Sequence, residues 1–317
     1  MARIVFLDRG TIGPQIDLRR PSGDHEWVEH LRTDPAEVVD RLRGAQIAVT
    51  NKVPLRRDVL EQLPDLKFIS VTATGYDVID MAACRDLGIT VSNVRGYAVH
   101  SVPEHVMALI LALKRQLPGY RADVLAGEWA RSKQFCFFTH PVEDLAGKTL
   151  GIIGGGSIGA SVGHLAQAFG MRVIYAARKG EAGNATRVAF DDFLAQSDVI
   201  TLHCPLTAET KGLIGAAEFA KMLRRPVIIN TARGGLIDEA EAAIALEQGL
   251  ISGLGVDVTT PEPPLPDNAL MAIAHLPNVI LTPHTAWASF EAMTALWAQV
   301  VESIEAFEVG APVRVLN

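Results

Sequence analysis

The sequence predicts an α/β protein made of two doubly wound domains with parallel sheets. Short runs rich in β-branched residues alternate with helical segments, which is typical of parallel strands joined by helices. This alternation occurs in two successive series along the chain. The length of 317 residues also exceeds what one ordinary hydrophobic core needs and suits two domains.

The first series covers the first third of the chain. Its strands are short apolar runs, and its helices have apolar residues at helical spacing. We expect strands at Ile4–Leu7, Ile47–Val49, Phe68–Val71 and Ile89–Val91, and helices at Ala36–Leu42, Arg56–Leu63 and Met81–Leu87.

The second series follows an expected helix from Ser101 to about Leu117. Ser101 and Glu104 form a capping-box pattern, and Pro118-Gly119 should end the helix. Its apolar residues lie on nearly every face, so we expect it to be buried between the domains. The later strands are expected at Thr149–Ile153, Arg172–Tyr175, Val199–Leu202, Val227–Asn230, Leu254–Val256 and Val279–Leu281.

These series divide the chain into two Rossmann- or flavodoxin-like domains with a cleft between them. We expect one domain to be discontinuous, comprising residues 1–98 plus 289–317. The other should comprise residues 99–288.

Composition excludes several classes of protein. The net charge of −7 argues against broad nucleic-acid binding, which needs a basic face. The three cysteines are scattered, which indicates reduced thiols in a cytoplasmic protein, and no residue cluster has metal-ligand spacing. The longest apolar run, Val106–Leu113, is too short to span a membrane.

The segment from Asp123 to Gly147 breaks the strand–helix rhythm and is rich in aromatic residues. One interpretation is a packed loop. We favour an arm that buries its rings against a second subunit, and we therefore expect a homodimer. The aromatic residues are Trp129, Phe135, Phe137 and Phe138.

A glycine-rich turn, Gly154 to Gly159, directly follows the expected strand Thr149–Ile153 and precedes a helix ending near Phe169. In a dinucleotide-binding turn, the first glycine allows the tight turn and the second admits the pyrophosphate. The third lets helix and strand pack closely. A glycine-rich turn without a ligand is the alternative, but the position between strand and helix favours a nicotinamide dinucleotide.

The end of the next strand indicates which dinucleotide is preferred. An NAD-binding domain usually has an acid there, which accepts hydrogen bonds from the ribose. Here the strand ends at Ala177, followed by Arg178 and Lys179. Two cations and no acid favour a 2′-phosphate, so we expect NADP to be preferred and NAD to be possible. The alternative is a solvated pair of surface charges.

Three later segments place an ionisable residue just beyond an expected strand, where ligands bind in open α/β sheets. They contribute Arg233, Glu262 and His284. A guanidinium can hold a carboxylate in a bidentate grip, and an imidazole can protonate an oxygen as hydride reaches its carbon. A nearby carboxylate can orient the imidazole and favour its charged form. Each residue alone has an ordinary structural explanation, but together, after the glycine turn, they predict carbonyl reduction.

These motifs resemble the D-isomer-specific 2-hydroxyacid dehydrogenase family over nearly the whole chain. The resemblance is carried by the glycine turn, His203–Thr207, Asn230–Gly235, Gly255–Val258 and Thr282–His284. It implies that Arg233 clamps the substrate, that His284 is the acid or base, and that Glu262 is its partner. It also implies that Asp257 contacts the nicotinamide side, and that the loop Thr72–Asp77 holds the substrate carboxylate through backbone N–H groups.

The residue patterns and the resemblance together give two sets of candidate site residues in addition to Glu262, and Arg178 after Ala177 is a departure from the family pattern. Those for the cofactor are Gly154, Gly156, Ser157, Ile158, Gly159, Arg178, Lys179, His203, Pro205, Thr210, Thr231, Ala232 and Asp257. Those for the substrate are Thr74, Gly75, Arg233, His284 and Trp287.

Within the family, the sequence is most similar to glycerate dehydrogenases, also called hydroxypyruvate reductases, through Ala73–Tyr76, Phe135–Phe137 and His284–Trp287. We therefore expect interconversion of a small 2-keto acid, hydroxypyruvate or glyoxylate, and its D-2-hydroxy acid. One alternative is a D-lactate, formate or phosphonate dehydrogenase on the same scaffold. Another is a nucleotide-sensing binding protein like the transcriptional corepressors that resemble this family.

Overall fold

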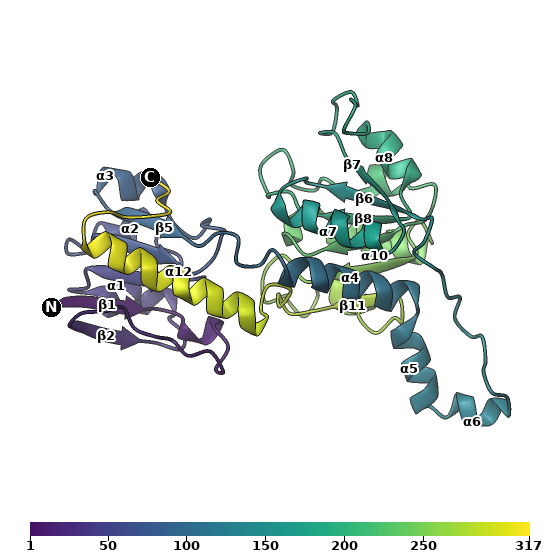
Figure 1. Ribbon diagram of the computed structural model, residues 1–317, viewed down its shortest axis with the longest axis horizontal. Helices are drawn as coiled ribbons and strands as arrows, with labels where there is room; N and C mark the ends of the chain where they lie inside the picture. The colour runs from purple at the N-terminus through teal and green to yellow at the C-terminus, as the bar shows by residue number, and fades with distance from the viewer. The chain divides into compact units, whose positions relative to one another are not determined.

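The computed structural model describes residues 1–317, which form two compact units (Figure 1). The first unit comprises Met1–Tyr97 together with Ala288–Asn317, and the second comprises Ala98–Trp287. Each unit contains one sheet in which all neighbouring strands are parallel. The prediction of two doubly wound α/β domains is therefore confirmed.

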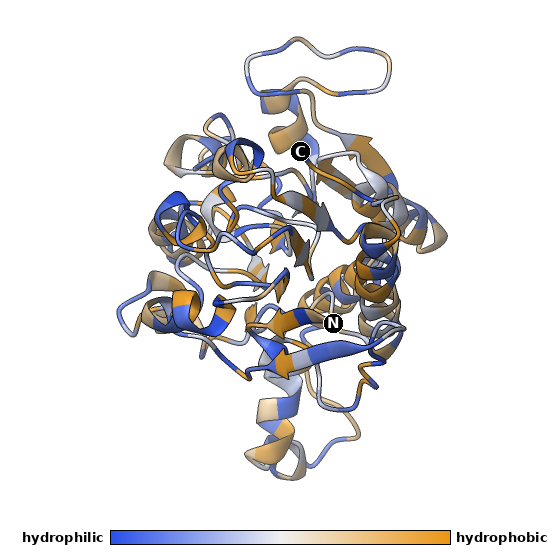
Figure 2. Cartoon of the chain, turned by 90° about the vertical axis from the view of Figure 1, so that its left-hand side faces the viewer, coloured by the Kyte–Doolittle hydropathy of each residue, from blue (hydrophilic) through white to orange (hydrophobic).

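The sheet of the first unit has five strands in the order β2-β1-β3-β4-β5. Buried aliphatic residues on the inner strands form its core, and Figure 2, which faces this unit, shows orange hydrophobic residues on the central strands. The strands are β1 (Ala2–Phe6), β2 (His25–Glu29), β3 (Ile47–Thr50), β4 (Phe68–Val71) and β5 (Thr90–Asn93).

Strand β2 was not expected from the sequence. It pairs only with β1, at the edge of the sheet, and none of its residues is fully buried. An edge strand whose residues are at most partly buried lacks the continuous apolar run that identifies a central strand.

The C-terminal segment returns to the first unit as the long helix α12 (Phe290–Glu308), whose first turn is capped by Ser289. Its Trp297 stacks on Phe6, with ring centroids 5.5 Å apart, and its Phe307 stacks on Phe68 at 4.5 Å. The other helices of this unit are η1 (Arg9–Thr11), η2 (Pro35–Glu37), α1 (Val38–Leu42), α2 (Arg57–Leu60) and α3 (Met81–Asp86).

The sheet of the second unit has six strands in the order β11-β10-β9-β8-β6-β7. The chain reverses its direction of winding between the neighbours β6 and β8, and such switch points are where open α/β sheets bind ligands. The strands are β6 (Thr149–Ile153), β7 (Arg172–Tyr175), β8 (Val199–Leu202), β9 (Val227–Asn230), β10 (Gly253–Val256) and β11 (Val279–Leu281).

The helices of the second unit pack on both sides of this core, and α4 lies beside α7 (Figure 1). None of the helices in the protein is both long and apolar enough to cross a membrane. The helices of this unit are α4 (Ser101–Lys114), α5 (Leu117–Leu125), α6 (Glu128–Ser132), α7 (Ser157–Ala168), α8 (Phe190–Gln196), α9 (Ala216–Phe219), η3 (Gly234–Leu236), α10 (Glu239–Glu247) and α11 (Ala269–Ile273).

Helix α4 differs from the prediction at both ends. The predicted capping box is absent, because the Ser101 hydroxyl donates to the carbonyl of Ala286 instead. The helix breaks at Gln116, whose φ of 54° is left-handed, and Pro118 lies in the first turn of α5. Proline is well tolerated in a first turn, so Pro118-Gly119 begins a new helix here. The buried face of α4 packs on α7, β9 and β10 of its own unit.

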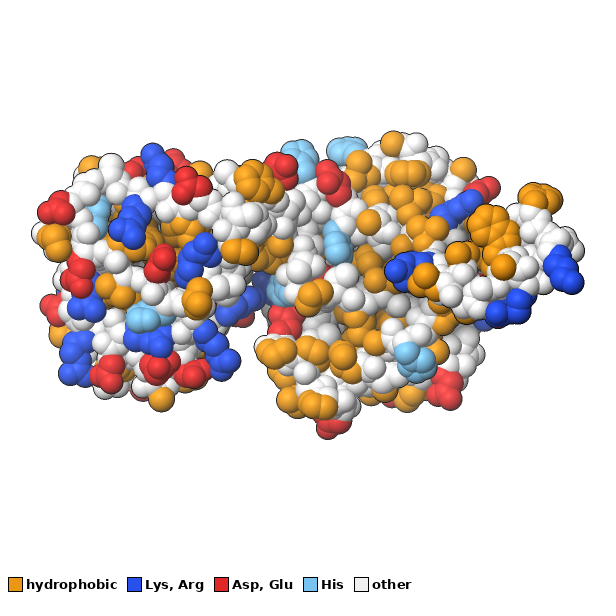
Figure 3. All heavy atoms as spheres, turned by 90° about the horizontal axis from the view of Figure 1, so that it is seen from below, with side chains coloured by type: hydrophobic (Ala, Val, Ile, Leu, Met, Phe, Trp, Pro, Cys, Tyr) orange, Lys and Arg blue, Asp and Glu red, His pale blue; other side chains and the backbone are white.

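The aromatic segment 123–147 is partly helical, contrary to the prediction of an irregular stretch, because α5 and α6 occupy its first part. Phe135 and Phe138 are 90% and 87% exposed, so their rings are not packed within the chain. Figure 3 shows hydrophobic side chains gathered on this arm, at the right-hand end of the view. The interpretation as a packed loop is therefore wrong for these two rings.

Candidate active site

The glycine-rich turn forms a tight cradle between β6 and α7. Gly154 has a φ of +102°, and a Cβ there would lie 2.5 Å from the backbone nitrogen of Cys204. A Cβ on Gly159 would lie 2.1 Å from the Gly154 carbonyl oxygen, whereas a Cβ on Gly156 would meet nothing within 4 Å. Gly154 and Gly159 thus allow close packing, and Gly156 leaves open space beside the N–H donors that begin α7.

His203 follows β8, directly across the switch point from this cradle, and its Nε2 lies 3.0 Å from the Thr201 hydroxyl. Burial lowers the pKa of His203 to about 4, because desolvation disfavours the charged ring. The imidazole is therefore neutral at physiological pH. A neutral ring can donate or accept a hydrogen bond here without adding charge to the site.

Two other predicted cofactor residues lie in the segments that follow the neighbouring strands β9 and β8. The buried hydroxyl of Thr231, just after β9, has no hydrogen-bond partner in the protein. The Thr210 hydroxyl donates to the Pro205 carbonyl and closes the turn after β8. An open glycine cradle, a free helix start and an unsatisfied buried hydroxyl together fit a dinucleotide, which would supply the missing partners.

The two cations predicted to bind the cofactor after β7, Arg178 and Lys179, have different surroundings. The Lys179 ammonium lies 2.7 Å from the carboxylate of Glu218, which is only 4% exposed. This ion pair neutralises the charge of Lys179 within the protein. The Arg178 side chain is 88% exposed and lies 4.0 Å from Glu181, so it remains available to a ligand.

Arg233 follows β9 on a loop that lies against the loop after β10. A Cβ on Gly234 would lie 2.3 Å from the carbonyl carbon of Thr259, so only glycine allows this approach. Asn230 holds the turn, because its side chain donates to the Arg233 carbonyl and accepts from the Ala232 N–H. One Arg233 nitrogen donates to the Ala232 carbonyl, and no acidic side chain pairs with the guanidinium. Its remaining donors are free for an anion.

The structure brings His284 and Glu262 together, and the sequence analysis expected them to be partners. The His284 Nδ1 lies 2.7 Å from the Glu262 Oε2, and both side chains are about 30% exposed, at 27% and 32%. The other Glu262 oxygen accepts the Thr259 N–H at 3.2 Å. This leaves the Nε2 of His284 to face a reacting group.

Asp257 orders the loop that carries His284. Its carboxylate is buried and accepts the Thr282 hydroxyl at 2.5 Å, the Thr285 N–H at 2.8 Å and the Ala286 N–H at 2.9 Å. The His284 N–H also donates to the Asp257 carbonyl. These bonds hold His284 at a φ of 54°, a backbone conformation that is uncommon outside glycine.

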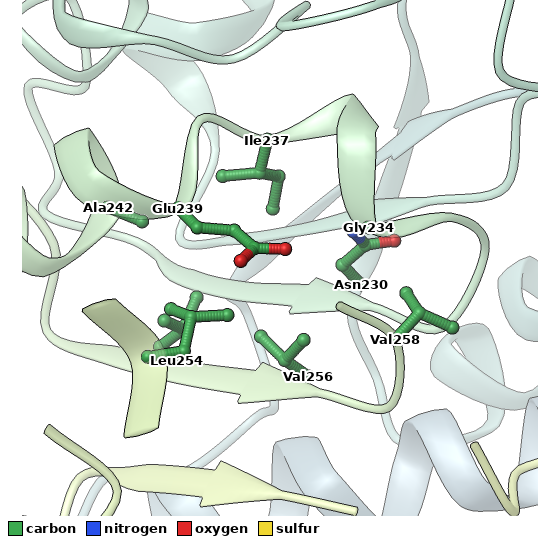
Figure 4. Close-up of a pocket in the computed structure, with 9 residues that line it drawn as sticks. Asn230, Gly234, Ile237, Glu239, Ala242, Leu254, Val256 and Val258 are labelled. Carbon is green, nitrogen blue, oxygen red and sulfur yellow. The ribbon is translucent and has the colours of Figure 1, made fainter. Parts of the chain in front are cut away.

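Sequence reasoning missed Glu239, which supports the Glu262 loop from α10. One Glu239 oxygen accepts the Thr260 N–H at 2.8 Å, and the other accepts from the Asn268 side chain. Figure 4 shows its carboxylate turned toward Asn230 and Gly234, over a cavity of only about 10 Å³. Such a space holds about one water and no substrate. The sequence signal was weak, since a glutamate in a first helical turn is ordinary.

The predicted carboxylate loop lies in the first unit, after β4. Its Thr74 hydroxyl donates to the Val94 carbonyl, and its Thr74 carbonyl accepts from the Asn93 side chain. The backbone N–H groups of Thr74 and Gly75 donate to no group in the chain. Two free, neighbouring N–H donors suit a carboxylate. Trp287, the remaining predicted substrate residue, is the last residue of the second unit.

Comparison with known proteins gives consistent matches. Residues 107–286 match the family described as D-isomer specific 2-hydroxyacid dehydrogenase, NAD binding domain. The glycerate dehydrogenase of Methylorubrum extorquens is 50% identical over 316 residues, covering 99% of both chains. The hydroxypyruvate reductase of Blautia hydrogenotrophica is 38% identical over 99% of both chains.

A solved structure covers the whole fold as well. An acyclic imino acid reductase in complex with NADPH and D-Arg has a TM-score of 0.81 and 30% identity. The match covers 99% of this chain and 100% of the other.

The low pKa of His203 has a consequence for stability. His203 has a pKa of about 4 in the folded protein and about 6.5 in the unfolded chain. Between these two pH values the unfolded chain therefore binds a proton at His203 that the folded protein does not bind. The free energy of unfolding should therefore fall as pH decreases through this window, by about 1–2 kcal/mol between pH 7.5 and pH 5.

Urea unfolding at these two pH values tests this expectation. The free energy of unfolding of His203→Gln should fall less between pH 7.5 and pH 5 than that of the wild type. His275→Gln, at an exposed position, serves as the control. Equal losses in wild type and His203→Gln would contradict the assignment.

Proposed function

This chain belongs to the D-isomer-specific 2-hydroxyacid dehydrogenase family, and we propose that it is an NADPH-preferring reductase of hydroxypyruvate or glyoxylate. The family resemblance inferred from the sequence motifs is thereby confirmed, as is activity on the CH–OH group of D-2-hydroxy acids. The substrate and the cofactor preference are the finer parts of the proposal.

One observation carries the proposal: the 2.7 Å contact between His284 and Glu262 lies among strand ends that also present an unpaired Arg233. All three residues follow neighbouring strands of one sheet, on the same side as the dinucleotide cradle. A proton donor and a carboxylate clamp are what reduction of a 2-keto acid requires.

In this proposal, each residue has one task. A bound reduced nicotinamide would supply the hydride that reduces C2 of the keto acid. Arg233 binds the substrate carboxylate through its planar donors. His284 gives its Nε2 proton to the carbonyl oxygen, so the product is a neutral alcohol. Glu262 acts through His284 by fixing the orientation of the ring through the 2.7 Å contact with Nδ1.

The substrate class is supported by the relatives, one named glycerate dehydrogenase and one named hydroxypyruvate reductase. The first unit would bind the substrate and the second the dinucleotide. We also propose a homodimer in which the exposed rings of Phe135 and Phe138 become buried, since two such rings are seldom left in water. A cytoplasmic enzyme is consistent with three free cysteines.

A panel assay tests the function directly. Hydroxypyruvate, glyoxylate and pyruvate would each be offered with NADPH and NADH, and kcat/KM would be measured for all six combinations. With NADPH, we expect kcat/KM to be larger for hydroxypyruvate and for glyoxylate than for pyruvate. A corepressor-like nucleotide sensor would bind NADPH and turn over none of the acids.

Arg233→Ala should cost ~2–5 kcal/mol in kcat/KM for the keto acid, because a charge-assisted clamp is lost. Arg233→Lys should restore only part, since an ammonium cannot reproduce the planar fork. NADPH affinity, measured by fluorescence titration, should change little in either variant. Arg20→Ala is the control: it also removes one exposed positive charge, and it should leave kcat/KM unchanged. A near-wild-type Arg233→Ala enzyme would refute the role of the clamp.

His284→Ala should lower kcat for reduction by roughly 10²–10⁴-fold, the usual size of general acid catalysis. Glu262→Gln should cause a smaller loss, because the amide keeps an acceptor for His284 Nδ1 but loses the charge. Because Glu262 acts only through His284, the double variant should be no slower than His284→Ala alone. If the free-energy losses of the two single variants add up in the double variant, Glu262 has a role that does not depend on His284.

The NADPH preference should be ten- to hundredfold, because one charge-assisted phosphate contact contributes ~1.5–3 kcal/mol. Ala177→Asp should invert it, since the new carboxylate repels a 2′-phosphate and accepts hydrogen bonds from an unphosphorylated ribose. Ala177→Asn is the matched neutral control and should lower NADPH use much less. Equal kcat/KM for the two cofactors in the wild type would overturn this part of the proposal.

A further inference from the structure

We infer that Arg187, a residue that no sequence motif singles out, contacts the 2′-phosphate of NADP and contributes more to cofactor discrimination than Arg178 does. The inference rests on the proposed cofactor preference and deepens it. It begins with the turn between β7 and α8.

Arg187 is held at the carboxyl end of β7 by its own backbone. The next residue, Val188, forms a parallel bridge with Ala176, through hydrogen bonds from the Val188 N–H to the Tyr175 carbonyl and from the Ala177 N–H to the Val188 carbonyl. In this parallel register Arg187 lies opposite Tyr175, the last residue of β7. Its side chain reaches the carbonyl of Ala176, which directly precedes Ala177, the position at which an NAD-binding domain would place its acid.

Asn184 fixes the turn that precedes Arg187. Its side-chain oxygen accepts the N–H groups of Thr186 and Arg187 at 2.9 and 3.0 Å, and also the Thr186 hydroxyl. The Asn184 N–H donates in return to the Arg187 carbonyl. A turn closed by one asparagine side chain presents Arg187 in a defined orientation.

The guanidinium itself lies between the strand end and the glycine cradle. Its Nη1 donates to the Ala176 carbonyl at 3.1 Å, and its Nη2 lies 3.6 Å from where a Cβ of Gly155 would be. No acidic side chain pairs with it. A cation with free donors, next to both the pyrophosphate turn and the ribose position, matches the phosphate that distinguishes NADP from NAD.

The two other nearby cations are less suited to this contact. Lys179 is neutralised by the buried Glu218, and Arg178 is 88% exposed with no anchoring hydrogen bond. Ordering a free arginine on a ligand costs side-chain entropy, whereas Arg187 is already partly fixed by Ala176. Arg187 should therefore provide the larger share of the phosphate contact.

The test measures binding of two probes to the full-length protein by calorimetry. Adenosine 2′,5′-bisphosphate carries the phosphate in question, and 5′-AMP lacks it. Arg187→Gln should weaken the bisphosphate by about tenfold or more, the loss expected for a charge-assisted contact, and leave 5′-AMP within about twofold. Arg187→Lys should recover part of the loss, and Arg178→Ala should lose less than Arg187→Gln.

Arg172→Gln is the matched control, because Arg172 begins the same strand at its opposite end, where it donates to Thr149. It removes the same charge and should leave both probes unaffected. If the wild type prefers the bisphosphate but Arg187→Gln binds it normally, the Arg187 inference is wrong and the NADPH preference stands. If the wild type binds both probes equally, the preference and the inference both fail. Turnover of keto acids is read separately in the panel assay.

Discussion

The buried carboxylate of Asp257 is the interaction on which the arrangement of the candidate site depends. An ionised group that is 2% exposed costs several kcal/mol unless hydrogen bonds replace its lost water. Here the replacement comes from the loop after β11, through Thr282, Thr285 and Ala286. The need to satisfy one charge therefore folds that loop back onto the end of β10. It also fixes the left-handed backbone of His284, a conformation that persists only where several contacts enforce it.

A steric constraint completes the arrangement from the other side. Gly234 lets the loop after β9 touch Thr259, at a distance that a Cβ would forbid, and Glu239 holds the next residue, Thr260, by its N–H. The segment carrying Glu262 is thus fixed against β9 and α10, while His284 is fixed by β10. The hydrogen bond between Glu262 and His284 joins two loops that are already ordered, so little entropy is lost when it forms.

The parts of the fold that could be predicted are those that depend on local pattern. The buried strands of the second unit are continuous apolar runs, and the glycine turn has a spacing set by backbone geometry, so β6 and the start of α7 followed from the residues alone. The edge strand β2 has no such run, and Pro118-Gly119 marked the end of α4 without indicating that a second helix, α5, would begin there. Glu239 and Arg187 act through contacts with distant segments, Thr260 and Ala176, which periodicity does not encode. The ion pair between Lys179 and Glu218 could not be predicted either, because Glu218 lies 39 residues further along the chain.

The cations around the strand ends show how a protein of net charge −7 can still present local sites for anions. Net charge governs long-range behaviour, but within a few ångströms the unpaired charges and aligned N–H groups set the potential. Lys179 is paired internally and contributes little, while Arg233 and Arg187 each donate to a carbonyl of the chain and have no acidic partner. A carbonyl holds a guanidinium in place without cancelling its charge, unlike a carboxylate. We assign Arg233 to the substrate carboxylate and Arg187 to the cofactor phosphate. Each is partly ordered before the ligand binds, because it donates to a carbonyl, and each keeps its full positive charge for the ligand.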